Sequence, residues 1–255
     1  MSPEQRALYL GTSGWAHRDW LGQLYPHDLP PAALLTTYAS HFNTVEIEHT
    51  FFDTPTRAMV QSWHRRTPDG FRFSPCAPRQ ITHVQRLHNT RGVLDDFLEV
   101  VGELGDKLGP ILFQLPADFR HAEHTHLETF LQTLPQERQF AIEFHHGSWL
   151  KESTFQLLEA YQVAWVIVEA SFLPRLPRVT APFAYVRWHG YRGIEQQSKR
   201  QLDPVTAWRP WVPILRQLER QAPCVYGYVR NSFSGYAPRD CQTLQALMGE
   251  GGEAA

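Results

Sequence analysis

The chain has 255 residues, of which 42% are hydrophobic and 20% are charged. This composition is typical of a folded globular protein, and it excludes a disordered chain, a collagen-like chain and a coiled coil. The 24 Lys+Arg residues against 26 Asp+Glu residues give a formal net charge of -2. Proteins that bind polyanions usually carry a clear basic excess, which this chain lacks as a whole.

Cysteine usage and hydropathy indicate the compartment. Cys76, Cys224 and Cys241 are the three cysteines, and their wide spacing argues against a disulfide framework or a structural zinc site. The N-terminal segment has no apolar run of signal-peptide length, and no stretch approaches the roughly 18 consecutive apolar residues of a membrane-spanning helix. We therefore expect a cytoplasmic protein with free thiols and no membrane partner.

Short β-rich runs alternate with helix-like stretches along the chain. The apolar, β-rich runs number eight and are Leu8–Gly14, Thr44–Phe52, Phe71–Cys76, Pro110–Pro116, Gln139–His146, Val163–Glu169, Phe183–Gly190 and Cys224–Asn231. The helix-like stretches are Pro31–Phe42, Thr56–Arg66, Val93–Leu108, Ala122–Leu134, Lys151–Tyr161, Pro204–Gln221 and Arg239–Met248. The strand starts lie roughly 30 residues apart, which is the size of one βα unit. This alternation predicts parallel strands with helices outside them.

Eight such units in a chain of this length favour a single (β/α)₈ barrel of the TIM type over residues 1–255. The main alternative is a doubly wound open sheet, which usually has fewer strands and a G-x-G-x-x-G first turn. The segment GTSGW at 11–15 does not follow that spacing. We expect the Pro-rich connection at 171–182 to be irregular in place of a helix, and the tail at 249–255 to be frayed.

Alternation along the strands predicts which side chains enter the barrel lumen. The apolar side chains of a strand meet the helices, so the polar residues between them are expected to point inward. By this rule the carboxyl ends of the strands bring together Glu46, Glu48, Gln114, Glu143, His145, Glu169, Arg187, His189 and Arg230. (β/α)₈ enzymes keep their active sites at this end, and unpaired buried charges cost several kcal/mol each. The cluster therefore indicates a functional site, with a purely structural ion-pair network as the alternative.

Several ordered sequence blocks resemble a known family, the YecE-like proteins with domain of unknown function 72. The blocks are GTSGW at 11–15, FNTVEIEHTFF at 42–52, ITHVQRL at 81–87, KLGPILFQLP at 107–116, AIEFHHGSW at 141–149, YVRWHG at 185–190 and GYAPRD at 235–240. The resemblance covers nearly the whole chain and implies a TIM-type barrel whose activity is not established. At the level of fold, such barrels are similar to endonuclease-four-like and sugar-isomerase-like barrels, which suggests phosphodiester or sugar chemistry.

The chain departs from the family pattern at four positions near the expected site. Glu48 stands where the family usually has Asn, Cys76 where it often has Lys, His145 where it has Arg, and Arg230 at the first of two paired Asn. We expect Arg230 to replace part of the positive charge lost at Cys76 and His145. The family's substrate specificity is therefore not carried over to this chain.

Two pairs of inward residues carry the expected chemistry. Glu46 and Glu143 are predicted to exchange protons with the substrate, because neighbouring charges push the pKa values of two carboxyl groups apart. His189 is predicted to assist as a proton-transfer group. Arg187 and Arg230 are predicted to hold an anionic group such as phosphate. Simple neutralisation of charge between the glutamates and arginines remains the alternative for both pairs.

Other residues are assigned to substrate binding or to packing. Trp15 is expected to stack on a sugar or base at the barrel mouth, and the remaining expected substrate contacts are Glu48, Gln114, His145 and Glu169. Trp20 and Trp149 are expected to pack loops over the barrel end. Cys76 is expected to be a passive thiol, because no local feature activates it.

The sequence requires no cofactor, but a divalent metal is an alternative. His145, Glu169 and His189 have the ligand types that Zn²⁺ and Mn²⁺ accept, although no local motif such as H-E-x-x-H is present. The polar loop at 189–201 supplies the local support for nucleic acid through its basic residues, which are Arg192, Lys199 and Arg200. A solvated loop is the alternative interpretation.

We therefore predict a hydrolase or lyase that acts on a phosphate- or sugar-containing substrate by general acid-base catalysis at the barrel mouth. One alternative is a non-catalytic protein that binds nucleic acid or a metabolite. Another is a metal-dependent phosphodiesterase or nuclease resembling endonuclease-four-like barrels. The sequence sets no oligomeric state.

Overall fold

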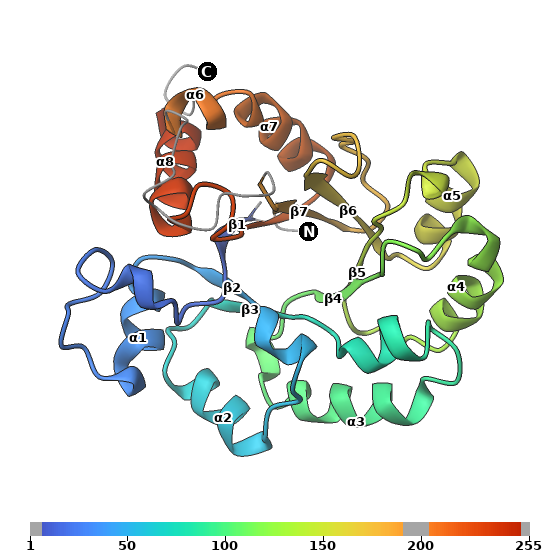
Figure 1. The fold of residues 1–255 in the computed structure, drawn as a ribbon, viewed down its shortest axis with the longest axis horizontal. Coiled ribbons are helices and arrows are strands. Elements are labelled where there is room, and N and C mark those ends of the chain that lie inside the picture. Colours follow the sequence, from blue (N-terminus) through green and yellow to red (C-terminus); the bar gives the residue numbers. More distant parts are fainter. Residues whose placement is uncertain (1–6, 191–203, 251–255) are drawn as a thin grey trace, which may run out of the picture.

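The structure is a computed structural model that describes residues 7–190 and 204–250. Eight parallel strands form a nearly closed barrel, and the chain runs once around it with its helices on the outside (Figure 1). The strands are β1 (Ala7–Ser13), β2 (Thr44–Ile47), β3 (Arg72–Pro75), β4 (Ile111–Gln114), β5 (Phe140–Glu143), β6 (Ala164–Glu169), β7 (Phe183–Trp188) and β8 (Cys224–Val229). The TIM-type barrel predicted from the sequence is confirmed.

The barrel closes between its two edge strands by a short contact. The sheet order is β3-β2-β1-β8-β7-β6-β5-β4, so β3 and β4 are the strands that must meet. Two isolated parallel bridges join them, between Phe73 and Leu108 and between Cys76 and Leu112. Gly109 N donates to the Phe73 carbonyl at 2.8 Å. Because the sheet closes here, the inward side chains of strands on opposite walls of the barrel share one lumen.

The helices follow the strands in the expected order. They are α1 (Leu34–Ala39), α2 (Arg57–Arg65), α3 (Arg91–Gly102), α4 (His124–Leu131), α5 (Glu152–Ala160), α6 (Pro204–Trp208), α7 (Trp211–Gln221) and α8 (Ala237–Glu250). Short 3₁₀ turns are η1 (Arg18–Trp20), η2 (Pro31–Ala33), η3 (Glu48–Phe51), η5 (Gly105–Lys107), η6 (His121–Glu123) and η7 (Gly147–Trp149), and η4 (Gln80–Val84) is a π turn. Helix α8 includes Gly249 and Glu250, which we expected to be frayed; residues 251–255 of the expected tail lie outside the described residues.

The single helix expected over Pro204–Gln221 is wrong, because the segment divides into α6 and α7. Pro210 lies between them as the N-cap of α7, and a proline cannot donate the backbone hydrogen bond that a continuous helix needs. The break lets both flanking tryptophans contact β7: Trp208 and Trp211 lie edge-on to Trp188, with ring centroids 5.3 and 5.1 Å away. Trp188 therefore faces the helices, as the alternation predicts.

The irregular connection expected after the sixth strand is confirmed. Residues 170–182 contain no helix. Side-chain contacts, not the packing of a helix, fix the position of this segment. The Arg175 guanidinium lies over the Trp211 ring, 4.4 Å from its centroid. Thr180 Oγ1 donates to the Val163 carbonyl at 2.6 Å and accepts from Trp165 N at 2.8 Å. The connection therefore brings loop residues over the carboxyl end of β6 without an intervening helix.

The hydrophobic core lies between the strands and the helices. Val45, Ile142, Val186 and Val225 are fully buried on the outer faces of their strands. Each such side chain contributes about 1.5–3 kcal/mol when it is removed from water. This apolar layer leaves the inner face of the barrel to the polar side chains of the site. Among the described residues, no helix is long and apolar enough to cross a membrane.

Candidate functional site

Arg187 joins two glutamates across the lumen of the barrel. Its Nη2 donates to Glu46 Oε1 at 2.8 Å, and its Nη1 donates to Glu143 Oε2 at 2.7 Å. The three residues come from β7, β2 and β5, and none of their side chains is exposed to solvent. The alternation along these strands thus predicted their inward direction. Pairing offsets the large cost of burying the three charges.

Glu46 is fully engaged by neighbouring donors. Besides Arg187, Ser13 Oγ donates to its Oε1 at 2.7 Å and the Tyr185 hydroxyl donates to its Oε2 at 2.8 Å. Burial, together with the Glu46 carboxylate, raises the pKa of Tyr185 well above its usual value, so the phenol keeps the hydrogen that it donates. Both carboxylate oxygens of Glu46 are therefore occupied by protein donors, and neither is free for a substrate. Glu46 serves to position Arg187. We did not predict Ser13 as part of the site, although its place on the inner face of β1 two residues after Gly11 is a signal for it.

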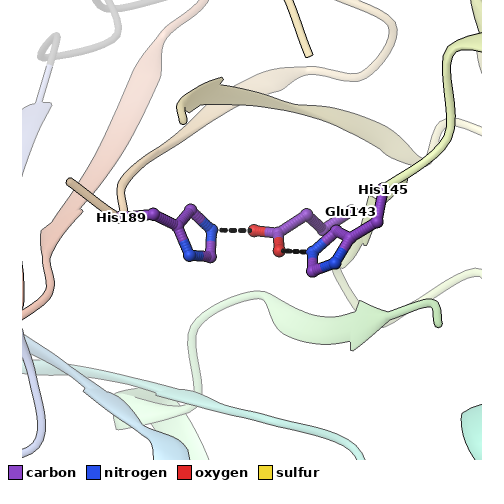
Figure 2. A group of neighbouring side chains, drawn as sticks. All are labelled: Glu143, His145 and His189. Atoms are coloured by element: carbon purple, nitrogen blue, oxygen red, sulfur yellow. Dashed lines mark hydrogen bonds and ion pairs between the residues drawn. The ribbon is translucent and has the colours of Figure 1, made fainter. Parts of the chain in front are cut away.

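Glu143 is the centre of the cluster. Figure 2 shows its carboxylate between two imidazoles: His189 Nε2 lies 2.9 Å from Oε2, and His145 Nε2 bonds to Oε1. Burial alone raises the pKa of a carboxyl group, but Arg187 and the two imidazoles outweigh it and hold the pKa of Glu143 well below its usual range. Glu143 is therefore a carboxylate at neutral pH. An ionised carboxylate has no proton to give, so Glu143 is poorly suited to act as the proton donor that we expected.

His189 is held in one tautomer by its two neighbours. Because a carboxylate accepts hydrogen bonds, Nε2 of His189 carries the hydrogen that faces Glu143. Its Nδ1 then accepts from Arg230 Nη1, which lies 3.3 Å away. Burial lowers the pKa of His189, and Arg187 and Arg230 lower it further, against the opposing effect of Glu143. His189 is thus a neutral imidazole that links Arg230 to the buried carboxylate.

His145 is the more accessible of the two imidazoles. Strand β5 ends at Glu143, and two residues further along the extended chain the His145 side chain lies on the same side. Phe172, from the irregular connection after β6, packs on the His145 ring with centroids 4.2 Å apart. The Nδ1 atom of His145 makes no hydrogen bond to any described residue. We did not predict Phe172, because an irregular loop gives no periodic signal.

Glu48 and Arg230 form an ion pair at the rim of the barrel. We expected both residues to point inward from their strands. Strand β2 was expected to continue to Phe52, but it ends at Ile47, and Glu48 begins the 3₁₀ turn η3. The alternation therefore fails at Glu48, whose carboxylate pairs with Arg230 Nη2 while both side chains stay about one-third exposed. Arg230 contacts both Glu48 and His189. It is therefore the guanidinium of the cluster that remains accessible from outside.

Three other expected substrate contacts lie at different places around the mouth. Gln114 Oε1 accepts from Arg187 Nη1 at 3.4 Å, so it belongs to the cluster. Glu169 pairs with Arg175 of the following loop and does not join the two imidazoles. Trp15 is half-buried and lies edge-on to Trp63, with ring centroids 5.6 Å apart.

The metal ligands that the structure brings together differ in one residue from those predicted from the sequence. Within residues 7–190 and 204–250, the group of three whose ligand atoms converge is Glu143, His145 and His189, and these atoms all lie within 4.8 Å of one another. We expected Glu169 in place of Glu143. Glu169 fails because Arg175 draws its carboxylate toward the loop.

The remaining sequence candidates have structural positions. Trp20 and Trp149 are buried, and their indole nitrogens donate to Asn231 Oδ1 at 3.0 Å and to the Phe119 carbonyl at 2.8 Å. Burial, with the nearby Glu46 carboxylate, raises the pKa of the Cys76 thiol well above its usual value, so Cys76 stays protonated. Arg192, Lys199 and Arg200, the basic residues of the expected nucleic-acid strip, lie outside the described residues.

A nearly closed parallel barrel with a charged cluster at the carboxyl ends of its strands defines the general class, which is the TIM-type α/β barrel. The comparisons with known proteins then narrow it. The family described as "Protein of unknown function DUF72" matches residues 9–255, and the chain belongs to this family.

The relatives agree with this assignment. UPF0759 protein YecE from Escherichia coli is 33% identical over 141 residues, which span 54% of this chain and 48% of YecE, about half of its length. UPF0759 protein YunF from Bacillus subtilis is 24% identical over 272 aligned positions and covers 94% of both chains. The crystal structure of a DUF72 family protein from Thermotoga maritima has a TM-score of 0.83 at 25% identity, covering 95% of this chain and 99% of that one. A DUF72 family protein from Enterococcus faecalis shares the fold, with a TM-score of 0.79 at 19% identity over 97% of this chain and 99% of its own.

Proposed function

We propose that the protein is a hydrolase or lyase that acts on a phosphate- or sugar-containing substrate by general acid-base catalysis at the barrel mouth. One observation carries the proposal: the ionised carboxylate of Glu143 is hydrogen-bonded to two imidazoles, His145 and His189, which follow the separate strands β5 and β7. This carboxylate lies at the end of the barrel where enzymes of this fold place their chemistry. A barrel that needed only stability would fill that space with apolar side chains.

His145 is the proton acceptor in this proposal. Its Nε2 is bonded to Glu143, which orients the ring and stabilises the positive charge that forms when Nδ1 takes up a proton. The side chain is 16% exposed, so a substrate hydroxyl or a water molecule reaches Nδ1 from the mouth. Phe172 covers one side of the ring and shields it from bulk water. His145 thus takes the proton-transfer role that the sequence assigned to Glu46 and Glu143.

Arg230 is the anion-binding group of the proposal. Its guanidinium is exposed enough to contact a ligand, and an anionic substrate would replace Glu48 as its partner. Arg187 has a different role, because both of its terminal nitrogens are bonded to buried glutamates and its side chain has no exposed surface. Arg187 and Glu46 are therefore positioning residues that fix Glu143. A phosphate or carboxylate on the substrate is the chemistry that Arg230 selects.

An activity screen tests the proposal. Purified protein is assayed on phosphomonoesters, phosphodiesters, glycosides and sugar phosphates, and the active class is measured again with His145→Gln. We expect kcat/KM to fall by about 100-fold or more, because general acid-base catalysis contributes about 10²–10⁴-fold. His146→Gln is the matched control: His146 is the adjacent residue, but its Nδ1 faces the backbone N and Oγ of Ser148 and not the cluster. Equal rates in His145→Gln and the unaltered protein would refute the assignment, and ligand-induced stabilisation without turnover would assign the mouth to binding.

A further inference from the structure

We propose that Glu143, His145 and His189 also form a binding site for one divalent transition-metal ion, with zinc as the best match. The site needs only these three ligands. When His145 binds the ion through Nε2, its Nδ1 carries the ring hydrogen, so the metal-bound state is separate from the state in which His145 accepts a proton. Two imidazole nitrogens and one carboxylate oxygen are a donor set that zinc accepts, with bonds of about 2.0–2.2 Å. The ligand atoms already lie within 4.8 Å of one another, so a single ion can reach all three after small side-chain movements.

The backbone brings these ligands together without strain in the segments that carry them. Glu143 ends β5 and His145 follows two residues later in extended chain, so both side chains point to the same side. His189 directly follows β7 and approaches Glu143 from the opposite side, as Figure 2 shows. Because the strands are held by the barrel, the ligands are fixed from two directions before an ion arrives.

The surroundings of the carboxylate also suit a metal site. Arg187 donates to Glu143 Oε2 and fixes the orientation of the carboxylate; bound metals commonly depend on such outer contacts to their ligands. Three protein ligands leave a fourth tetrahedral position open to a water molecule or a substrate oxygen. The His145 side chain is 16% exposed, which places that open position toward the mouth. This arrangement corresponds to a catalytic type of zinc site more than to a closed structural one.

Arg230 opposes metal binding and gives the proposal a distinctive test. For Nε2 of His189 to bind a metal, the ring hydrogen must move to Nδ1, which lies 3.3 Å from Arg230 Nη1. Two donors would then face each other, and a guanidinium charge would lie close to the ion. Arg230 can turn away because it is already paired with Glu48 at the rim. Replacing Arg230 by glutamine removes the charge and supplies an oxygen that accepts from Nδ1.

The experiment measures metal binding directly on the full chain. Protein treated with a chelator and dialysed is titrated with Co²⁺, whose visible absorption reports tetrahedral coordination, and then with Zn²⁺ as a competitor. We expect one Co²⁺ per chain, displaced by one Zn²⁺. His145→Gln should weaken binding by more than about 10-fold, because even outer-contact losses cost about 10–100-fold. Arg230→Gln should tighten it, and His146→Gln should leave it unchanged.

Three outcomes would overturn the site: no tetrahedral absorption at one equivalent, equal affinity in His145→Gln and the unaltered protein, or equal losses in His145→Gln and His146→Gln. The last would indicate binding to scattered surface histidines. Circular dichroism of each variant separates a lost ligand from a lost fold. Because the readout is the metal and not turnover, failure here leaves the acid-base proposal standing, and failure of the activity screen leaves the metal site standing.

Discussion

Arg187 and Glu143 form an ion pair of 2.7 Å in which neither side chain has any exposure to solvent. Arg187 makes the same kind of pair with Glu46 on the other side of the barrel. The side chain therefore connects β7 to both β2 and β5 through the lumen. Its Nε atom is buried and has no hydrogen-bond partner among the described residues, so the two terminal nitrogens carry all of its pairing.

Removing this arginine should be strongly destabilising. Arg187→Met leaves two carboxylates buried without their cation, and breaking a buried pair in this way costs about 3–5 kcal/mol. The free energy of unfolding is measured by urea denaturation at neutral pH. Arg91→Met serves as the control, because Arg91 pairs with Asp95 on the exposed surface of α3, where ion pairs contribute little. Equal stability of Arg187→Met and the unaltered protein would mean that the lumen is hydrated enough to solvate both carboxylates.

Stability should fall in acid, with His189 as one cause. Burial and the neighbouring arginines lower the pKa of His189 in the folded protein, whereas an unfolded histidine titrates near 6.5. As the pH falls through about 6.5, the unfolded chain takes up a proton that the folded chain does not, so folding loses free energy. Glu143, with its lowered pKa, adds a second loss as the pH falls through about 4.3, the ordinary carboxyl range.

The contribution of His189 is tested by its removal. The unfolding free energy of His189→Gln should change less between pH 7 and pH 5 than that of the unaltered protein. His41→Gln, at an exposed position, controls for the loss of a histidine in general. A His189→Gln profile with the same slope over this range would show that His189 titrates alike in the folded and unfolded chains, which contradicts a lowered pKa in the fold.

Gly11 should not tolerate a side chain. A Cβ atom at Gly11 would lie 2.1 Å from the Thr44 carbonyl oxygen, which belongs to the neighbouring strand β2. Since the obstacle is backbone, Gly11→Ala must push β1 and β2 apart, at a cost of about 1–3 kcal/mol or more. Gly92→Ala is a control of opposite sign: nothing lies within 4 Å of its Cβ position in α3, so alanine should stabilise the helix by up to about 1 kcal/mol. Thermal unfolding of both variants measures the difference, and a Gly11→Ala protein as stable as the parent would contradict the close strand contact.

The Tyr38 hydroxyl should contribute substantially to the stability of the fold. It accepts from Thr12 N at 2.9 Å and donates to the Thr44 carbonyl at 3.0 Å, so one buried atom satisfies two strands. Tyr38→Phe leaves both backbone groups without a partner, which costs about 1–3 kcal/mol for an unsatisfied buried group. Tyr161→Phe is the matched control, because the Tyr161 hydroxyl makes no hydrogen bond to the described residues. Identical urea midpoints for the two variants would indicate that another group replaces the phenol.

The order of elements could be predicted from the sequence because it depends on local patterns. The alternation in β7 identified Arg187 and His189 as inward residues and Trp188 as an outward one, and the structure agrees. Strand ends were harder to predict. The sequence after Ile47 continues the alternation of apolar and polar residues, but the backbone turns into a 3₁₀ helix at Glu48. The alternation therefore no longer predicts where the Glu48 side chain points.

The partners within the site could not be predicted in the same way. The sequence placed both Glu143 and Glu169 inward, Glu169 less securely, and assigned Glu169 to the metal alternative. Arg175, in a loop without periodic pattern, pairs with Glu169. The packing of β5, β6 and β7 side by side brings Glu143 close to His189. Phe172 completes the site from an irregular loop that carries no periodic signal.

Strand alternation and βα spacing are properties of neighbouring residues, so the order of residues alone predicts a parallel barrel and most of the charged side chains that face its lumen. Which charges meet, which are buried and which stay accessible follows from the folded barrel. Those outcomes depend on distances across the barrel, between residues as far apart in the chain as Glu46 and Arg187, and no local pattern encodes such distances.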